Sequence, residues 1–491
     1  MRRFFGAGAA SFILALLLLT GCVSDSGVDN NLKRVPKIVL LMEKSTENLS
    51  DSELVIEKLN EYIKPIIGVE IDILFAGTST YGKTLQAMLA AEEQVDIVFS
   101  VAFGSLVSLV DEGKVIPLDA LINQYGNGIT EQIVPDELVV GRVGGRLYGV
   151  TTNRNKGFVF GFQYRKDIAE KYDIDMSAVK RLEDLTSVFQ TLKDANPDMR
   201  PYIPSRYART WDHLSLDYLD FGVLMDCGQN LDVVNLYETQ TYEDYVRLIY
   251  EWNRAGYVLD TTLNYSSDRH YYFRSDNAFC RLDTDSPEMI ERESRVVGKP
   301  IGYVALSPVF TCTIDMTYAM WSITSSCANP DKAMEFLNLM YSDPAVANLL
   351  LNGVEGAHYV FADKEQALID FPPGLDSTTS GYFQHSGWKY GNMFITYVWA
   401  GNRPSVWGEI RDYNKTSLKS KALGFVFDPS PVSNEYANCA RVWLRYNDGL
   451  NAGVLDPDVY LPKLREEMKA AGIDRIIAEK ERQLNEWLDA M

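Results

Sequence analysis

Histidine is scarce in this sequence, with only four residues among 491. No two of the four lie four positions apart, so a helical pair of zinc ligands is excluded. The HExxH motif of zinc proteases, the GxSxG motif of serine hydrolases and the GxGxxG motif of dinucleotide-binding loops are also missing. We therefore expect no metal ion and no cofactor, and we expect the loop glycines to be ordinary turn residues.

Positive charge is in short supply as well. The 47 Lys and Arg residues are outnumbered by 67 Asp and Glu residues, which gives a formal net charge of −20. Nucleic acids and anionic lipid surfaces are bound through basic surfaces, so this balance argues against both as partners. The chain can nevertheless bury large cores, because 46% of its residues are hydrophobic and 12% are aromatic.

Long hydrophobic runs are absent except at the N-terminus. Arg2 and Arg3 precede an uncharged, mostly apolar stretch, and Leu19-Thr20-Gly21-Cys22 follows that stretch. A basic start, a short apolar centre and small residues are typical of a secretory signal. The last four of these residues resemble the lipobox of bacterial lipoproteins, which implies cleavage before Cys22 and attachment of lipid to it.

A lipidated Cys22 predicts a tethered protein. Each buried CH₂ group of an acyl chain such as palmitate contributes ~0.8 kcal/mol, so two or more chains hold a domain firmly at a membrane. The polar segment that follows, up to residue 36, is expected to be a flexible spacer. The alternative is an uncleaved membrane anchor, because the apolar run is close to the length that spans a bilayer.

Cysteine is also infrequent. Five cysteines remain besides Cys22, and none of them forms a CxxC pair, so neither a zinc knuckle nor a redox dithiol is indicated. Because five is an odd number, at least one stays unpaired within the chain. We expect buried free thiols that behave as small apolar residues, at the positions Cys227, Cys280, Cys312, Cys327 and Cys439.

The N-terminal third of the chain carries a regular alternation of apolar patterns. Strand patterns at 37–42, 69–75 and 95–99 are separated by helix patterns, the first starting with a capping box at 50–53 and the second centred on 85–89. Such a β-α-β-α-β order predicts a parallel sheet with right-handed crossovers. Ligands of these sheets bind beyond the carboxyl ends of the strands.

Further patterns predict more helices and a returning strand. Helical spacing occurs at 182–192, 242–252, 330–341 and 473–488, and a short apolar stretch near 278–283 predicts a strand. No internal repeat or long linker separates these segments, which favours interwoven lobes over independent domains.

Aromatic residues are frequent near the expected strand ends and loops. Aromatic faces pack on the apolar faces of sugar rings, while nearby polar side chains bind the ring hydroxyls. This composition is consistent with a saccharide site, although any one of these rings can equally belong to a core. The candidates are Tyr81, Phe103, Tyr148, Trp211, Trp321, Trp388, Trp399 and Trp407.

Several ordered motifs carry a family resemblance. They are residues 94–99 leading into 113–119, residues 164–172, residues 321–323 before 329–337, and residues 353–359. In this order they resemble the extracellular solute-binding lipoproteins of bacterial ABC importers, in the carbohydrate-type group related to maltodextrin-binding protein. The tail from 424 to 474 resembles a C-terminal region of a Gram-positive subgroup.

The resemblance implies an α/β, two-lobe periplasmic-binding-protein-like fold. Each lobe would be a mainly parallel sheet flanked by helices, with the ligand cleft between the lobes. The implied boundaries are a signal peptide at 1–21, the lipidated Cys and spacer at 22–36, lobe 1 at 37–148 and 288–350, and lobe 2 at 149–287 and 351–491.

The implied function is transport. The protein would capture a saccharide by lobe closure, without altering it, and deliver it to an ABC transporter permease. It would be a monomer, anchored by lipid to the extracellular face of the cytoplasmic membrane. Two alternatives stay open from the residues alone, a sensor or adhesion lipoprotein of the same fold and a surface glycoside hydrolase with two cleft carboxylates.

The resemblance also implies ligand-binding positions. They lie after the third strand, at the two crossings between the lobes, on lobe 2, and in the loops that follow residue 353. By position they are Ser100, Phe103, Asn153, Arg154, Trp211, Asp283, Glu355 and Trp388.

Overall fold

The first apolar strand pattern forms the centre of a mixed sheet. The computed structural model describes residues 35–45, 48–101, 103–204, 210–215, 219–260 and 269–490. Strand β1 (Lys37–Glu43) is buried from its second residue onward, as expected of a strand covered on both faces. It pairs in parallel with β2 (Glu70–Ala76) and β3 (Ile97–Val101), which confirms the predicted order of elements.

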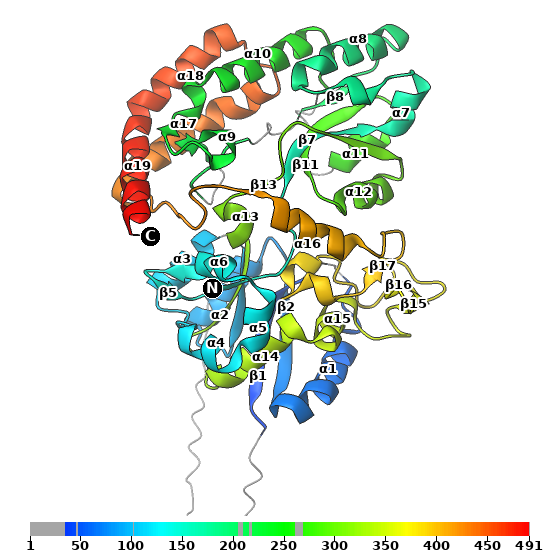
Figure 1. Cartoon of the computed structure of the whole chain (residues 1–491), viewed down its shortest axis with the longest axis vertical. Coiled ribbons are helices and arrows are strands. Elements are labelled where there is room, and N and C mark those ends of the chain that lie inside the picture. Colours follow the sequence, from blue (N-terminus) through cyan, green and yellow to red (C-terminus); the bar gives the residue numbers. More distant parts are fainter. Residues whose placement is uncertain are drawn as a thin grey trace, which may run out of the picture. The chain divides into compact units, whose positions relative to one another are not determined.

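Two later strands complete this first sheet. The strand order is β2-β1-β3-β14-β6, and β14 (Ala319–Ile323) runs antiparallel to both β3 and β6 (Val150–Thr151). One continuous hydrophobic core joins the sheet to its helices. These helices are α1 (Ser52–Ile67), α2 (Tyr81–Ala90), α3 (Phe103–Asp111), α4 (Asp119–Tyr125), α5 (Asn127–Gln132), α14 (Pro330–Ser342) and α15 (Pro344–Asn352) (Figure 1).

The start of α1 differs from the predicted capping box. Its N-cap is Asp51, whose side chain makes no capping hydrogen bond, so the box expected at 50–53 is not formed. Asp51 Oδ2 instead lies 3.2 Å from Nε2 of the buried His358. The end of the helix follows the prediction, because Gly68 takes the left-handed conformation that closes it.

The second sheet is built mainly of antiparallel pairs. Its order is β12-β7-β11-β8, where β7 (Val159–Arg165) runs antiparallel to β11 (Cys280–Asp285) and to β12 (Ile301–Ala305). Only the pair of β11 with β8 (Tyr202–Ile203) is parallel. The expectation of a mainly parallel sheet in each lobe is therefore wrong for this sheet, and the first sheet has two parallel and two antiparallel pairs among its described strands. The physical reason is that the chain enters the second sheet along β7 and leaves it along β12, which runs in the opposite direction toward the second crossing.

Helices cover the second sheet and extend into a helical layer. Around the sheet lie α7 (Lys166–Lys171), α8 (Leu185–Ala195), α11 (Arg269–Arg274) and α12 (Met289–Val297). The C-terminal helices α17 (Ser433–Asn451), α18 (Pro457–Ala471) and α19 (Ile473–Asp489) share a core with part of α10 (Gln240–Arg254), beside which Figure 1 places them. No helix within the described ranges is both long enough and apolar enough to cross a membrane.

Short elements fill the connections between these parts. The brief helices are α6 (Pro135–Leu138), α9 (Met225–Gly228), α13 (Thr313–Thr317) and α16 (Val406–Thr416). The brief strands are β4 (Arg142–Val143), β5 (Arg146–Leu147), β9 (Val223–Leu224), β10 (Val233–Val234), β13 (Phe310–Thr311), β15 (Val360–Asp363), β16 (Leu368–Asp370), β17 (Val398–Trp399) and β18 (Leu418–Lys419).

Three backbone segments run between the two sheets and lie side by side. The first, residues 152–158, links β6 to β7, and the second contains β13 on the way from β12 to β14. Phe158 and Phe310 exchange backbone hydrogen bonds of 3.0 and 2.9 Å, and β13 pairs in parallel with β18 of the third segment. The two lobes are therefore connected by a small paired unit of their own.

Asn414 fastens the first crossing segment to α16. Its Oδ1 accepts hydrogen bonds from the backbone N–H groups of Lys156 at 2.8 Å and Gly157 at 2.9 Å. Its Nδ2 donates to the carbonyl oxygen of Arg154 at 2.7 Å. One side chain thus satisfies three backbone groups that no strand pairing reaches, and it fixes the position of Arg154.

The strand pairing departs from the implied lobe boundaries. Residues 301–305 pair within the second sheet, although the implied lobe 1 included 288–350. The backbone oxygen of Lys389 accepts the indole N–H of Trp321 in the first core, although the implied lobe 2 included 351–491. Because the chain crosses three times, we propose that residues 36–151 and 319–400 form lobe 1 and that 159–305 and 420–490 form lobe 2.

The cysteines behave as the spacing predicted. None of the five described cysteines is in a disulfide bond, and four of them are buried. Burial raises the pKa of the Cys227 thiol to about 11 and that of Cys439 to about 12. Both thiols stay protonated at neutral pH and are poor nucleophiles, so they serve as packing residues.

We predict that Lys389→Ala strongly destabilises the protein. The Lys389 Nζ lies 2.7 Å from the Glu43 carboxylate, and both side chains are almost completely buried. Removing one partner leaves a buried charge uncompensated, which costs about 3–5 kcal/mol. Urea denaturation measures this loss. The control Lys332→Ala breaks a partly exposed pair with Glu335 and should cost less than about 1 kcal/mol. Equal losses in the two variants would contradict the prediction.

Candidate functional site

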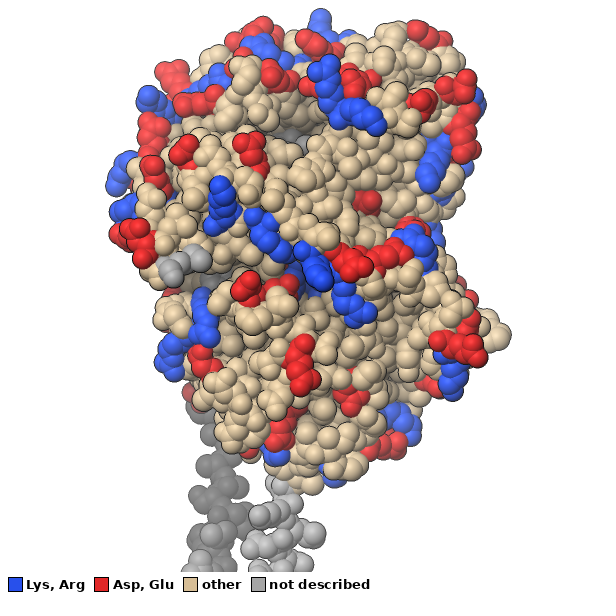
Figure 2. Space-filling model, in the orientation of Figure 1, with Lys and Arg blue, Asp and Glu red and all other residues tan. Residues whose placement is uncertain are grey.

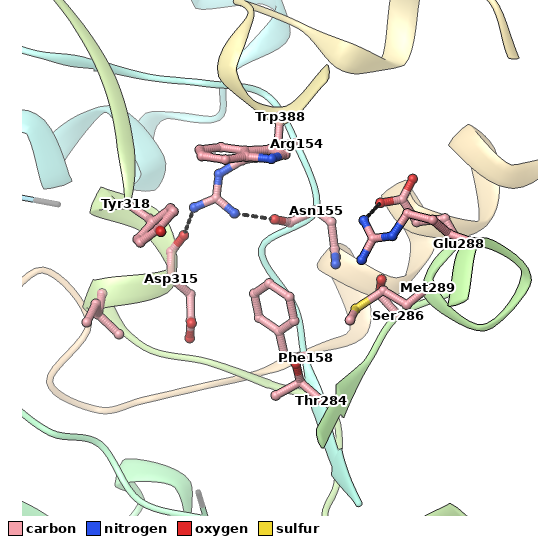
Figure 3. A pocket seen from close by; sticks show the side chains of 12 residues that line it. Arg154, Asn155, Phe158, Thr284, Ser286, Glu288, Met289, Asp315, Tyr318 and Trp388 are labelled. Atoms are coloured by element: carbon pink, nitrogen blue, oxygen red, sulfur yellow. Dashed lines mark hydrogen bonds and ion pairs between the residues drawn. The ribbon is translucent and has the colours of Figure 1, made fainter. Parts of the chain in front are cut away.

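A hollow of about 280 Å³ lies where the crossing segments meet the two sheets. We call it the first hollow (Figure 3). Its walls come from the first crossing segment, from the end of β11 and the following α12, from α13, and from a loop after α15. The lining residues are Arg154, Asn155, Phe158, Thr284, Ser286, Glu288, Met289, Arg292, Ile314, Asp315, Tyr318 and Trp388.

Arg154 is held rigidly in the wall of the first hollow. Its side chain is buried, and its guanidinium donates to the carbonyl oxygens of Asn155, at 2.6 Å, and of Asp315. The same group lies 5.9 Å from the centre of the Tyr318 ring, within the range of a cation–π contact. These contacts place a positive charge at a defined point between the crossing segment and α13, as Figure 3 shows.

Aromatic rings form one side of the first hollow. The Trp388 ring lies 5.5 Å from Tyr318 and 6.3 Å from Phe99, measured between ring centres. Trp388 is only partly buried, so part of its surface faces the hollow rather than the core. Such a ring offers a large apolar contact area at a fixed position.

Two polar atoms in the first hollow have no partner within the described part of the chain. Asn155 Oδ1 and Ser286 Oγ are both buried and make no hydrogen bond there. A buried polar atom without a partner costs free energy, so native proteins rarely leave one unsatisfied. Polar groups of a ligand can supply the missing partners.

The charges around the first hollow balance. Arg154 and Arg292 are matched by Glu288 and Asp315, which gives two positive and two negative side chains. Burial raises the pKa of Glu288 above its ordinary value, and the nearby Arg292 and Arg295 oppose this shift. The hollow therefore offers hydrogen-bonding groups without a strong field of either sign, which suits an uncharged polar ligand.

A larger hollow of about 650 Å³ adjoins the first and shares Glu288, Arg292 and Trp388 with it. We call it the second hollow. It is lined by α12 and by the loops between residues 370 and 407. Its aromatic lining residues are Phe371, Phe383, His385, Trp388, Tyr397, Trp399 and Trp407.

The helical N-terminus of α2 resembles a phosphate-binding loop in sequence but not in structure. Residues 77–84 fit the spacing GxxxxGK[ST], although we expected ordinary turn glycines there. Neither glycine has a positive φ, and the N–H groups of Thr80 and Tyr81 already donate to the Gly77 oxygen. The Thr78 hydroxyl donates to the Glu43 carboxylate, whose charge repels phosphate. The loop is an ordinary turn, as expected.

Among the described residues, no group of three or more histidine, cysteine or carboxylate side chains is arranged to hold a metal ion. The first hollow contains two carboxylates but neither a histidine nor a cysteine in its lining. Its donors are an amide, hydroxyls and a guanidinium, which are groups that recognise a polar organic ligand.

Two of the positions implied by the family resemblance meet in the first hollow. Arg154 and Trp388 both line it. Asn153 lies beside it on the crossing segment, where its Nδ2 donates to the Gln132 carbonyl oxygen at 3.0 Å. Asp283 lies on β11 just before the lining residue Thr284, and its carboxylate is 3.2 Å from the Arg281 guanidinium.

Three other implied positions do not line either hollow. Ser100 is buried in β3, and Trp211 is buried in the core beneath α17–α19, where its indole N–H donates to Asp220 at 2.9 Å. Glu355 is exposed in a turn away from both hollows. Phe103 begins α3, and its side chain lies outside the described part of the structure.

Most lining residues carry no signal in the sequence. Asn155 directly follows the predicted crossing residue Arg154 and Phe158 lies four residues after it, so the first crossing was found but not its inward-facing side chains. The return crossing was expected at Asp283, but β11 leads into α12 and β12 of the same sheet, and the chain crosses back only after residue 305. Tyr318 and Arg292 come from helices whose relation to the crossing depends on tertiary packing. No local pattern of residues could have identified them.

Comparisons with known proteins agree with this architecture. Residues 52–267 match the family described as bacterial extracellular solute-binding protein, and residues 421–489 match a domain of unknown function (DUF3502). A carbohydrate ABC transporter substrate-binding protein of Streptococcus pneumoniae serotype 4 (strain ATCC BAA-334 / TIGR4) is 25% identical over 477 residues. That alignment covers 95% of this chain and 93% of the relative.

Solved structures confirm the two-lobe α/β fold. The crystal structure of an N-glycan transport solute binding protein from Streptococcus pneumoniae is similar with a TM-score of 0.82 and 23% identity, covering 92% of this chain and 99% of that one. The complex of that protein with Man1GlcNAc has a TM-score of 0.74 and 23% identity, over 92% of this chain and 100% of the other.

We predict that Asp285, which directly precedes Ser286, makes stability depend on pH. Burial and the nearby Asp283 raise the pKa of Asp285 from 3.8 to about 7. The folded state therefore keeps this proton up to about pH 7, whereas the unfolded chain loses it near pH 4. Stability should fall as pH rises through this window, by roughly 1.4 kcal/mol for each pH unit.

The variant Asp285→Asn should remove this dependence. Urea denaturation between pH 4 and pH 8 should show the variant gaining stability relative to the unsubstituted protein as pH rises. Parallel pH profiles for the two proteins would contradict the assignment.

Proposed function

We propose that this chain, which belongs to the bacterial extracellular solute-binding proteins, captures an uncharged saccharide between its lobes and delivers it to the permease of an ABC importer. The observation that carries the proposal is the first hollow, whose lining combines aromatic rings with two buried polar atoms that have no partner in the described portion of the chain. Sugar rings combine apolar faces with hydroxyl groups, so they complement both features.

The origin of the lining residues supports capture by closure. Trp388, Tyr318 and Asp315 are attached to the first sheet, whereas Ser286 and Met289 follow β11 of the second sheet. A saccharide in the hollow would contact both lobes at once. It would bind the closed form better than the open form, and this difference in affinity is what drives closure.

A tether at the membrane would keep the protein close to its permease. Cys22 and the preceding signal lie outside the described residues, so this part of the proposal rests on the sequence alone. Residues 22–36 would form the spacer between the lipid and the lobes. The related carbohydrate ABC transporter substrate-binding protein supports a partnership with an importer. We place the protein, as a monomer, on the extracellular face of a Gram-positive cytoplasmic membrane.

We further propose that the protein releases its ligand unchanged. Its relatives are described as binding proteins, and the substrate-binding role needs no bond cleavage. Glu288 and Asp315 would be the carboxylates of a hydrolase at this site. Release of shorter sugars by the purified protein, measured by chromatography after long incubation, would overturn this part of the proposal.

The surface charge is consistent with a small uncharged ligand. On the face shown in Figure 2, acidic and basic side chains are interspersed, and a short oblique row of lysines and arginines runs beside acidic residues. No broad basic field covers this face, as a nucleic-acid partner would require.

We predict that Trp388→Ala weakens saccharide binding by at least about tenfold, which corresponds to about 1.4 kcal/mol. The ring lines both hollows, so its loss removes contact area from the bound sugar. The first step is a thermal-shift screen of mono- and oligosaccharides, because a ligand that binds only the folded state raises its melting temperature. Calorimetry with the best ligand then compares the variants.

The matched control is Trp487→Ala. Trp487 packs on Phe425 in the C-terminal core, away from both hollows, so this variant should bind with unchanged affinity. If no member of a broad, pure saccharide panel raises the melting temperature of the unsubstituted protein, the saccharide function is wrong.

We predict that Cys22→Ser releases the protein from the membrane. Without the thiol no lipid can be attached, so the variant should move from the membrane fraction to the soluble fraction. Immunoblots of fractionated cells measure the distribution. Cys327→Ser, which changes a free cysteine inside the fold, is the control and should stay membrane-bound. A Cys22→Ser protein that remained in the membrane fraction would indicate an uncleaved anchor instead.

A further inference from the structure

The second hollow has its own polar anchor, Gln384. This side chain is completely buried and lines the hollow. Its Oε1 accepts the backbone N–H of Ser45 at 2.8 Å, which fixes the orientation of the amide. Its Nε2 makes no hydrogen bond within the described part of the chain. Two N–H donors are thus held in place without an acceptor, at a position where leaving them unpaired is costly.

An aromatic cluster lies beside this donor. The Trp399 ring is 4.5 Å from Phe371 and 5.0 Å from Phe383, and the two phenylalanine rings are 5.1 Å apart. Trp399 is oriented by its indole N–H, which donates to Asn352 Oδ1 at 3.0 Å. All three rings are only partly buried, so the cluster presents apolar surface to the hollow.

The charges of the second hollow also cancel. Arg292 and Arg295 are matched by Glu288 and Asp370. Burial and the nearby Lys389 and Arg292 lower the pKa of His385, which disfavours a positive charge on its ring. The hollow therefore resembles the first one chemically, with apolar rings, a fixed hydrogen-bonding group and no net charge.

The two hollows adjoin each other. They share three lining residues, and Trp388 belongs to the walls of both. The first hollow, at about 280 Å³, is small for a ligand site, whereas the second, at about 650 Å³, lies well within the usual range of 300–1,000 Å³. A ligand confined to the first hollow would leave the Gln384 donors unpaired.

We infer that the second hollow is a separate subsite, and that the ligand is an uncharged oligosaccharide long enough to occupy both hollows. One end of the chain lies in the first hollow against Trp388, Asn155 and Ser286. Later sugar rings lie against the cluster of Phe371, Phe383 and Trp399, where a ring oxygen or hydroxyl accepts from Gln384 Nε2. This inference rests on the proposed saccharide function and adds a requirement for chain length.

The test uses saccharides of defined length. Malto-, cello-, chito-, manno- and fructo-oligosaccharides from one to six units are titrated by calorimetry against the full lipid-free chain. Affinity should rise by at least about tenfold between the shortest and the longest member of the series that binds best. Equal affinity for the monosaccharide and the longer chains would overturn the inference while leaving the proposed function intact. Absence of binding by every series would overturn the proposed function itself.

Two substitutions in the second hollow test whether the dependence of affinity on saccharide length arises there. Gln384→Glu keeps the acceptor for Ser45 but replaces the free donors, and Phe371→Leu removes an aromatic face at a partly exposed position. Each substitution should lower the affinity for the longest ligand by about tenfold and the affinity for the shortest ligand by less than about twofold. Phe371→Leu keeps the test decisive if the buried Gln384→Glu variant fails to fold.

The matched control lies in the first hollow. Ser286→Ala removes a buried hydroxyl that has no partner in the described part of the chain, so folding should be unaffected. This variant should lower the affinities for short and long ligands by the same factor. If the second-hollow variants and Ser286→Ala all lowered the affinities for short and long ligands equally, the second hollow would not be a separate subsite.

Discussion

The pairing of three crossing segments is the constraint on which the site depends. The backbone exchange between Phe158 and Phe310 and the pairing of β13 with β18 hold the segments together, and Asn414 fixes the first of them to α16. Arg154 and Asn155 lie in this segment and line the first hollow. The walls on either side belong to different sheets, so any movement about the crossing segments changes the shape of the hollow.

Buried charged groups that stabilise the fold differ from the buried polar groups that can bind a ligand. The buried ion pair between Glu43 and Lys389 is satisfied internally. Asn155 Oδ1, Ser286 Oγ and Gln384 Nε2 are buried polar atoms without such partners among the residues that the structure describes. Because a buried polar atom is costly to leave unpaired, these three positions mark where a ligand adds free energy without competing against the fold.

Periodicity predicted the first sheet well. The strands and helices up to residue 101 occur in the expected order because burial on both faces of a strand, or on one face of a helix, leaves a local pattern. The direction of pairing in the second sheet left no such pattern. It depends on how often the chain crosses between the lobes, and the third crossing through β18 was not predicted.

The site was predicted less completely for the same reason. Arg154 and Trp388, two of the eight positions implied by the family resemblance, line the first hollow, and their role in ligand binding stays a prediction. Trp211 illustrates the limit, since a tryptophan in a core and one in a binding wall look alike in sequence. Gln384 and Ser286 were missed because only packing reveals that a polar side chain is buried without a partner.

The most direct test of this account is a crystal structure of the protein with a bound oligosaccharide of the series that gives the highest affinity. The account predicts sugar rings in both hollows, with one ring against Trp388 and hydrogen bonds to Asn155, Ser286 and Gln384. A saccharide bound elsewhere on the molecule, with both hollows left without sugar, would contradict it.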